Sequence, residues 1–139
     1  MSSSSLTWLH VSDLHFGHGD ANYRFDQRGV TNGIVSNAEQ MTKRLGPPDL
    51  LFVTGDIAFS GQPDQYGQAK EWLTRLRAAV GGSPRLLLVP GNHDVDRKLA
   101  TKIASAALHK DLRSDPKKLD ELLHDPSQMQ PLWPKLRLF

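Results

Sequence analysis

Three short apolar segments of the sequence (6–13, 49–56 and 85–92) run directly into polar side chains that can bind a metal ion or move a proton. In chain order, these side chains are Asp13, His15, Asp56, Asn92, His93 and Asp94. Carboxylate and amide oxygens together with imidazole nitrogens suit divalent ions such as Mn²⁺, Fe or Zn²⁺. The sequence contains no cysteine, which excludes thiolate zinc sites and leads us to expect a reducing, cytoplasmic environment.

The order and spacing of these residues indicate what each can do. Asp13 and His15 form an Asp-x-His pattern that can direct both side chains to one side, and Asp56 on the neighbouring strand can bridge two ions. Two ions about 3.5–4 Å apart activate a shared water and hold the oxygens of a phosphate in line. His93 can then give a proton to the leaving oxygen. For Asp94 two roles stay open, because it can orient His93 or cap the turn that follows.

The elements that must position these residues are visible as a change of pattern along the chain. Each apolar segment has the length of a strand, is rich in Leu and Val, and ends at Gly or a polar turn-former. The second and third are apolar at consecutive positions, which is typical of strands covered on both faces. Helical patterns occupy 31–46 and 63–82. This β-α-β-α-β order predicts an α/β fold whose parallel strands end at one edge, where ligands bind.

The chain has 139 residues, enough for one domain. Residues 1–96, with 8 Lys and Arg against 10 Asp and Glu, are predicted to form the catalytic βαβαβ part. Residues 97–139, with 9 against 5, are predicted to be a helical segment with amphipathic helices at 97–112 and 114–125. Such a basic segment can attract nucleic acid, but its alternating charges favour a solvated helical face. Its apolar end leads us to expect a continuation into further domains.

Several other functions lack support in the sequence. It has no P-loop, no Gly-x-Ser-x-Gly and no Gly-x-Gly-x-x-Gly motif, and no segment is long and apolar enough to predict a membrane span. Arg24 and Arg28 follow the first strand on a long segment. The pattern favours solvated loop charges there, with the mouth of a substrate site as the alternative.

Three motifs follow the apolar strands in order: Asp-Leu-His at 13–15, Gly-Asp at 55–56 and Gly-Asn-His-Asp at 91–94. Together they resemble the calcineurin-like metallophosphoesterases. The resemblance implies an α/β/β/α sandwich, of which this chain supplies the first βαβαβ half plus C-terminal helices. It implies hydrolysis of a phosphate mono- or diester by a hydroxide bound to two divalent metal ions (Mn, Fe or Zn). The sequence leaves open whether the substrate is a nucleotide, nucleic acid or another phosphoester.

The resemblance also implies a role for each matching residue. Asp13 and His15 would hold the first metal ion. Asp56 would bridge both ions, and Asn92 would ligate the second ion and help to orient the phosphate. His93 would be the acid near the leaving group.

The sequence departs from the family pattern in two ways. Many members carry an Asp three residues after the bridging Asp, where it orients the acidic His, and this chain has Phe59 there. The family also takes His ligands from later strands, whereas only His109 and His124 follow residue 94, both in helical patterns. We therefore expect the remaining ligands beyond residue 139 and little turnover from this chain alone. The alternative is a non-catalytic scaffold or sensor domain of a larger signalling protein.

Overall fold

The chain folds into alternating strands and helices. The computed structural model describes residues 5–96, 103–115, 117–125, 127 and 130. The elements in chain order are β1 (Trp8–Ser12), α1 (Ala21–Leu45), β2 (Leu50–Thr54), α2 (Pro63–Val80), β3 (Arg85–Val89), α4 (Ile103–Ser114) and α5 (Lys117–His124). Their order confirms the predicted α/β fold class and its β-α-β-α-β first half. The start of the helix predicted over 97–112 and the apolar end of the sequence lie outside the described residues.

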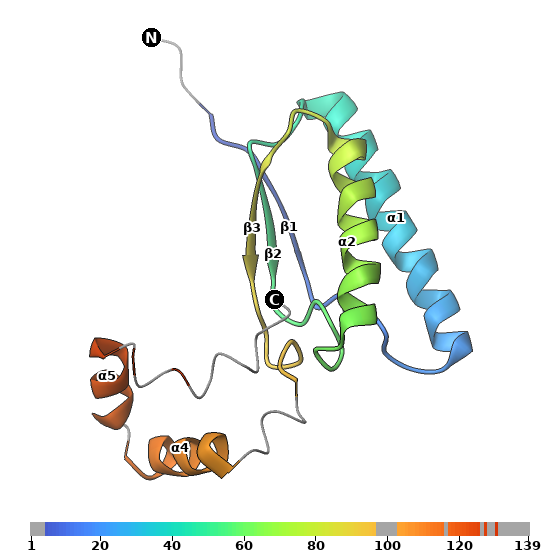
Figure 1. Cartoon of the computed structure of the whole chain (residues 1–139). Coiled ribbons are helices and arrows are strands. Elements are labelled where there is room, and N and C mark those ends of the chain that lie inside the picture. Colours follow the sequence, from blue (N-terminus) through green and yellow to red (C-terminus); the bar gives the residue numbers. More distant parts are fainter. Residues whose placement is uncertain (1–4, 97–102, 116, 126, 128–129, 131–139) are drawn as a thin grey trace.

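The strands form one parallel sheet in the order β1-β2-β3, and α1 and α2 cover the same face of it (Figure 1). Leu9, Leu51 and Leu86 are paired across the strands on that face. Leu51 and Val53 of the central strand are fully buried there, and they pack in one core with Trp72 of α2. Because the strands are parallel, their carboxyl ends meet at one edge, where the polar residues predicted from the sequence follow.

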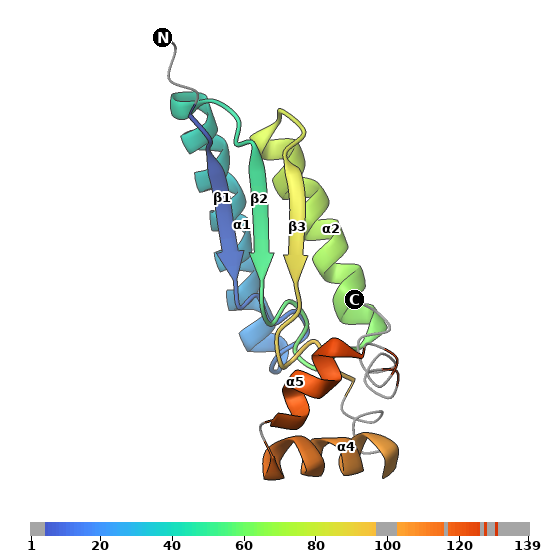
Figure 2. The same ribbon diagram turned by 90° about the vertical axis from the view of Figure 1, so that its left-hand side faces the viewer.

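The second face of the sheet is open among the residues that the structure describes. The consecutive apolar residues of β2 and β3 predict cover on both faces, but no described helix or strand covers the face turned to the viewer in Figure 2. Trp8 and Val89 are 62% and 52% exposed on it. The reason is topological, because right-handed crossovers in the order β1-β2-β3 put both connecting helices on the same side.

Helix α1 begins at Ala21, ten residues before the start at residue 31 that the apolar spacing predicts. The Asp20 side chain caps its first turn by accepting a hydrogen bond from the Asn22 N–H at 3.0 Å. Phe25 and Val30 are 70% and 65% exposed, so this first part of the helix buries no apolar stripe that the sequence could reveal. Arg28 therefore lies on a helix and not on a loop.

Helix α2 is held at its N-terminal end and along one face. Its buried residues recur at helical spacing and include Ala69, Trp72 and Leu76, which confirms the predicted core stripe. From the first turn of α2, the Gln65 side chain accepts hydrogen bonds from the Ser60 and Gln62 N–H groups and fixes the loop after β2.

Within the described residues, no helix is both long enough and apolar enough to cross a bilayer.

Candidate metal centre

The loops that leave β1 and β2 carry an unusual backbone conformation at the predicted ligands. Asp13, His15 and Asp56 have φ values of 56°, 48° and 46°. Residues other than glycine rarely adopt this left-handed region, which costs on the order of 1 kcal/mol or more per residue. Among the described residues outside glycine, Ser83 alone shares it. Such strain concentrates at functional sites, where the surrounding structure holds it in place.

Backbone hydrogen bonds continue the pairing of β1 and β2 beyond the strands and hold the two loops together. The His15 N–H donates to the Asp56 carbonyl at 2.8 Å, and the Phe16 N–H donates to the Ile57 carbonyl at 2.9 Å. From α1, the Gln27 side-chain amide donates to the carbonyls of Leu14 and His15 at 2.6 and 2.9 Å. The positions of His15 and Asp56 relative to each other are therefore fixed by main chain.

Three side chains converge at this edge of the sheet. His15, Asp56 and His93 each offer a ligand atom, and these atoms lie within 4.8 Å of one another. His15 Nε2 is 3.8 Å from Asp56 Oδ2, and the rings of His15 and His93 have centroids 4.9 Å apart. The side chains of His15 and Asp56 are 26% and 13% exposed, so a cation could enter from one side.

The donor set fits a divalent transition-metal ion. Two imidazoles and a carboxylate, without thiolate, suit Mn²⁺, Fe or Zn²⁺. The Nδ1 atom of His15 is buried without a hydrogen-bond partner, a state that costs about 1–3 kcal/mol unless another interaction offsets it. The residues present therefore fit the metal that the sequence predicts.

Asp13 and Asn92 lie at the same edge but are more open to solvent. Asp13 directly follows β1 and is exposed, and it is not part of the group of three whose ligand atoms converge. Asn92, in the loop after β3, is also exposed. Both stay predicted ligands. His93, predicted only as a proton donor, joins His15 and Asp56 in the group whose ligand atoms converge.

The backbone of Phe59 holds the ring of His93. The Phe59 carbonyl lies 2.8 Å from His93 Nδ1, and the two rings stack at 5.3 Å. A carbonyl oxygen only accepts hydrogen bonds, so Nδ1 carries the hydrogen and Nε2 is the nitrogen left for chemistry. The His93 N–H also donates to Asp56 Oδ1 at 2.9 Å. The backbone of Phe59 thus supplies the orienting acceptor that its side chain lacks, a contact that sequence reasoning could not find.

The carboxylate of Asp94 contacts backbone N–H groups of two loops and the hydroxyl of Tyr66. Asp94 is 1% exposed, and its carboxylate accepts hydrogen bonds from the N–H groups of Ile57, Ala58 and Gly91, at 3.1, 2.7 and 2.9 Å. The Tyr66 hydroxyl donates to it as well, at 3.1 Å. None of its hydrogen bonds goes to His93, so the geometry corresponds to the alternative in which Asp94 holds a turn.

Burial raises the pKa of the Tyr66 phenol above its ordinary value, and the nearby negative charge and hydrogen bond of Asp94 add to this rise. The phenol therefore stays protonated and keeps donating to the carboxylate. Tyr66 belongs to α2 and was not singled out by any sequence motif, because a tyrosine on a helical stripe reads as an ordinary core residue.

Gly91 allows the loop after β3 to approach Asp56. A Cβ atom at residue 91 would collide with the Asp56 backbone nitrogen and with Oδ1 of its carboxylate. Only glycine fits this contact, because the group that would have to move is a candidate metal ligand. The glycine was visible in the sequence as a turn residue, but its contact with Asp56 depends on the tertiary structure.

Comparisons with known proteins show which family the chain belongs to. The calcineurin-like phosphoesterase family matches residues 6–134, and the chain belongs to this family. It is 37% identical over 87 residues to a glycerophosphodiester phosphodiesterase of Enterobacter lignolyticus, covering 61% of this chain and 28% of the relative. It is 30% identical over 106 residues to a probable cyclic nucleotide phosphodiesterase of Coxiella burnetii, covering 74% and 37%.

A third relative is a cAMP/cGMP dual specificity phosphodiesterase of Mycobacterium tuberculosis, which is 30% identical over 86 residues, covering 62% of this chain and 26% of the relative. The matched part thus spans about a quarter to two fifths of the length of these relatives. Each relative's activity is named for a protein roughly three to four times as long as the part it shares with this chain.

Proposed function

We propose that the protein hydrolyses phosphodiesters at a centre of two divalent metal ions, and that this chain contributes His15, Asp56 and His93 to that centre. The observation that carries the proposal is the convergence of their ligand atoms within 4.8 Å at the carboxyl ends of parallel strands. The family supports it, and so do relatives named for cleaving glycerophosphodiesters and cyclic nucleotides, all of which are phosphodiesters.

In this proposal His15 and Asp56 hold the metal ions, with Asp13 and Asn92 as further ligands from the same edge. When bound, divalent ions supply positive charge that polarises the phosphoryl oxygens and makes water a nucleophile at neutral pH. Asp56 is suited to bridge two ions, because backbone contacts from both neighbouring loops, at His15 and His93, fix its position.

His93 can serve in one of two ways through Nε2. With Nδ1 bound to the Phe59 carbonyl, a neutral ring presents a lone pair at Nε2 and a protonated ring presents a hydrogen there. A nitrogen that ligates an ion cannot also deliver a proton, so the two roles exclude each other. We propose the proton donor at the leaving oxygen, with the Phe59 carbonyl holding the ring in position, and the experiment below separates this role from that of a ligand.

The test combines metal analysis with turnover. The longest natural form of the protein is loaded with Mn²⁺, its metal content is measured, and hydrolysis of bis(4-nitrophenyl) phosphate is followed. The proposal expects two ions per chain and a loss of turnover by about 10²-fold or more in Asp56→Asn. His93→Ala should keep its metal and lose about 10²-fold in turnover, since general acid catalysis has that magnitude.

The matched control is Asp26→Asn, which removes an exposed carboxylate on α1 and should leave both measurements unchanged. Metal-free protein without turnover would refute the proposal and favour the non-catalytic scaffold. If His93→Ala loses metal together with turnover, its role is that of a ligand.

A further inference from the structure

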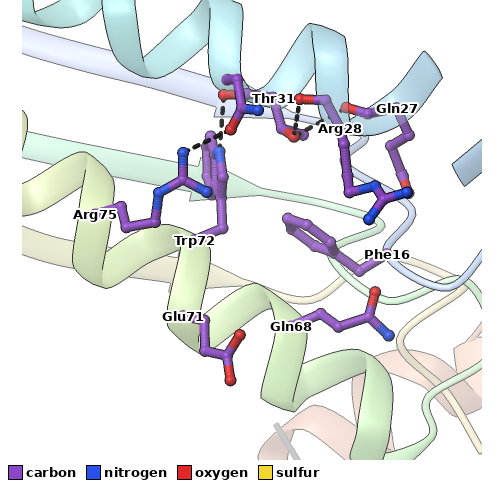
Figure 3. Close-up of a pocket in the computed structure, with 9 residues that line it drawn as sticks. Phe16, Gln27, Arg28, Thr31, Gln68, Glu71, Trp72 and Arg75 are labelled. Atoms are coloured by element: carbon purple, nitrogen blue, oxygen red, sulfur yellow. Dashed lines mark hydrogen bonds between the residues drawn. The ribbon is translucent and has the colours of Figure 1, made fainter. Parts of the chain in front are cut away.

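A cleft of about 480 Å³ with a mixed polar and apolar lining lies between α1 and α2, on the helical side of the molecule. Small-molecule sites typically enclose about 300–1,000 Å³. Figure 3 shows the cleft, whose lining residues are Phe16, Gln27, Arg28, Thr31, Asn32, Gln68, Glu71, Trp72 and Arg75. None of the residues predicted to bind metal lines it.

The floor of the cleft is aromatic and preformed. Phe16 and Trp72 are 6% and 3% exposed, and their ring centroids are 5.9 Å apart. The Trp72 indole N–H donates to the Thr31 carbonyl at 2.9 Å, which ties α2 to α1 at the base of the cleft. A ligand would therefore meet a surface that needs little ordering, and preorganisation of this kind favours binding.

Two guanidinium groups, one from each helix, point into the space between the helices (Figure 3). Arg75 reaches from α2 and donates to the Asn32 side-chain oxygen at 2.5 Å. Asn32, the partner of Arg75, lies one helical turn after Arg28 on α1, which is a backbone rise of about 6 Å. Neither forms an ion pair with another described residue. Glu71 forms none either, and its carboxylate points away from α1 in Figure 3.

We propose that this cleft is a binding site for an organic phosphate monoester of mononucleotide size. The phosphate lies between Arg28 and Arg75, since planar guanidinium groups pair with phosphate through parallel hydrogen bonds. The organic part lies over Phe16, because inorganic phosphate would leave most of the volume and the aromatic floor unused. The net positive charge of the lining, two arginines against one glutamate, selects an anion.

The cleft also contacts the loop that carries His15. Gln27 lines the cleft and at the same time donates to the His15 carbonyl, and Phe16 follows His15 directly in the chain. A bound ligand should therefore change the NMR chemical shifts of the backbone amides of residues 15 and 16 as well as those of α1.

The experiment uses the full 139-residue chain treated with EDTA, so that the metal centre does not hold the probe. Adenosine 5′-monophosphate is titrated while the Trp72 indole N–H and the amides of residues 27–32 are followed by ¹H–¹⁵N NMR. We expect saturable chemical-shift changes there. Adenosine, which has no phosphate, and inorganic phosphate, which has no organic part, should each bind about tenfold more weakly.

The variants test whether binding depends on these two arginines or only on the overall positive charge of the chain. Arg28→Ala and Arg75→Ala should each weaken binding by about fivefold or more. Arg28→Lys should have an intermediate affinity, because lysine keeps the positive charge but lacks the paired N–H donors of the planar guanidinium group. Glu71→Gln should tighten binding by about twofold, since it removes the opposing charge. Arg44→Ala removes a matched arginine from the far end of α1 and should change nothing.

The proposal is overturned if Arg28→Ala, Arg75→Ala and Arg44→Ala bind alike, or if the shifts are confined to residues 13–15, 55–57 and 91–94. Repeating the titration in Asp56→Asn should leave the affinity unchanged. A failure of the proposed metal centre would therefore leave this result intact, and a failure here would leave the metal centre untouched.

Discussion

The carboxylate of Asp94 joins the loops that follow β2 and β3 by accepting hydrogen bonds from the N–H groups of both. Replacing it by Asn turns one acceptor oxygen into an NH₂ group, which would face a backbone N–H and leave it unsatisfied. We expect Asp94→Asn to lower the free energy of unfolding by about 2–4 kcal/mol, because a buried donor without its charged partner costs that much. Urea denaturation monitored by circular dichroism measures the change.

Asp26→Asn serves as the control for Asp94→Asn, because the Asp26 side chain is exposed on α1 and should change the free energy of unfolding by no more than about 0.5 kcal/mol. Equal urea midpoints for the two variants would contradict the role of Asp94 in holding the loops.

The raised pKa of Tyr66 predicts a pH dependence of stability with a definite sign. The folded chain holds the phenolic proton more tightly than the unfolded chain. The contribution of Tyr66 to stability is therefore complete below the ordinary pKa near 10 and decreases as the pH rises above it. Because the side chain is partly exposed, we expect the loss at pH 11 to be at most about 1 kcal/mol.

Tyr66→Phe removes this proton and the hydrogen bond to Asp94. It should cost about 1 kcal/mol at pH 8, where the bond is intact, and the free energies of unfolding of the two proteins should converge towards pH 11. Denaturant titrations at several pH values between 8 and 11 give both curves. Parallel curves would contradict the link between Tyr66 and Asp94.

Residue types and their order were sufficient to predict where the candidate site lies, but not how it is held. Asp56 and His15 are recognisable because each follows an apolar strand, and parallel strands end at one edge. The acceptor of His93 is a backbone carbonyl, and every residue has one, so no side chain marks Phe59 for this role. The contact of Gly91 with Asp56 joins residues 35 apart in the chain, and such pairs have no local signal.

At the scale of elements, the length of α1 yields a prediction about its glycines. Gly29 lies within the helix, and a Cβ atom there would meet nothing within 4 Å. Gly29→Ala should therefore raise the free energy of unfolding by about 0.5–1 kcal/mol, because alanine loses less backbone entropy in a helix. Thermal denaturation would record the gain.

Gly46 is the matched control for Gly29. It follows the last residue of α1 with φ at +88°, where an alanine side chain is strained, and its N–H donates to the Thr42 carbonyl. Gly46→Ala should destabilise the chain by about 1 kcal/mol. If both substitutions stabilise, the helix does not end at residue 45 as described.

The strands and the helices were not equally predictable. The short apolar runs of the strands were visible because their central residues, such as Leu51 and Val53, are fully buried. The first part of α1 was missed because Phe25 and Val30 are exposed there and leave no apolar period. The placement of α1 and α2 on one face of the sheet followed from strand order, which apolar runs alone do not encode.

At the scale of the whole molecule, the candidate metal centre exists only when the chain is folded. His15, Asp56 and His93 come from three separate loops, and the unfolded chain does not hold their ligand atoms together. An ion that binds this group should therefore bind the folded state and not the unfolded one. Such binding stabilises the fold by an amount that grows with the ratio of free ion to dissociation constant.

We therefore expect Mn²⁺ to raise the melting temperature of the chain. At a hundredfold excess over the dissociation constant the gain is about 2.7 kcal/mol, and for a chain of this length each kcal/mol raises the melting temperature by about 3–5 °C. EDTA should reverse the shift, and Asp56→Asn should abolish it, whereas Asp26→Asn should keep it. A melting temperature that does not respond to Mn²⁺, Fe²⁺ or Zn²⁺, or an equal response in Asp56→Asn, would mean that the three converging side chains do not form a metal centre in this chain.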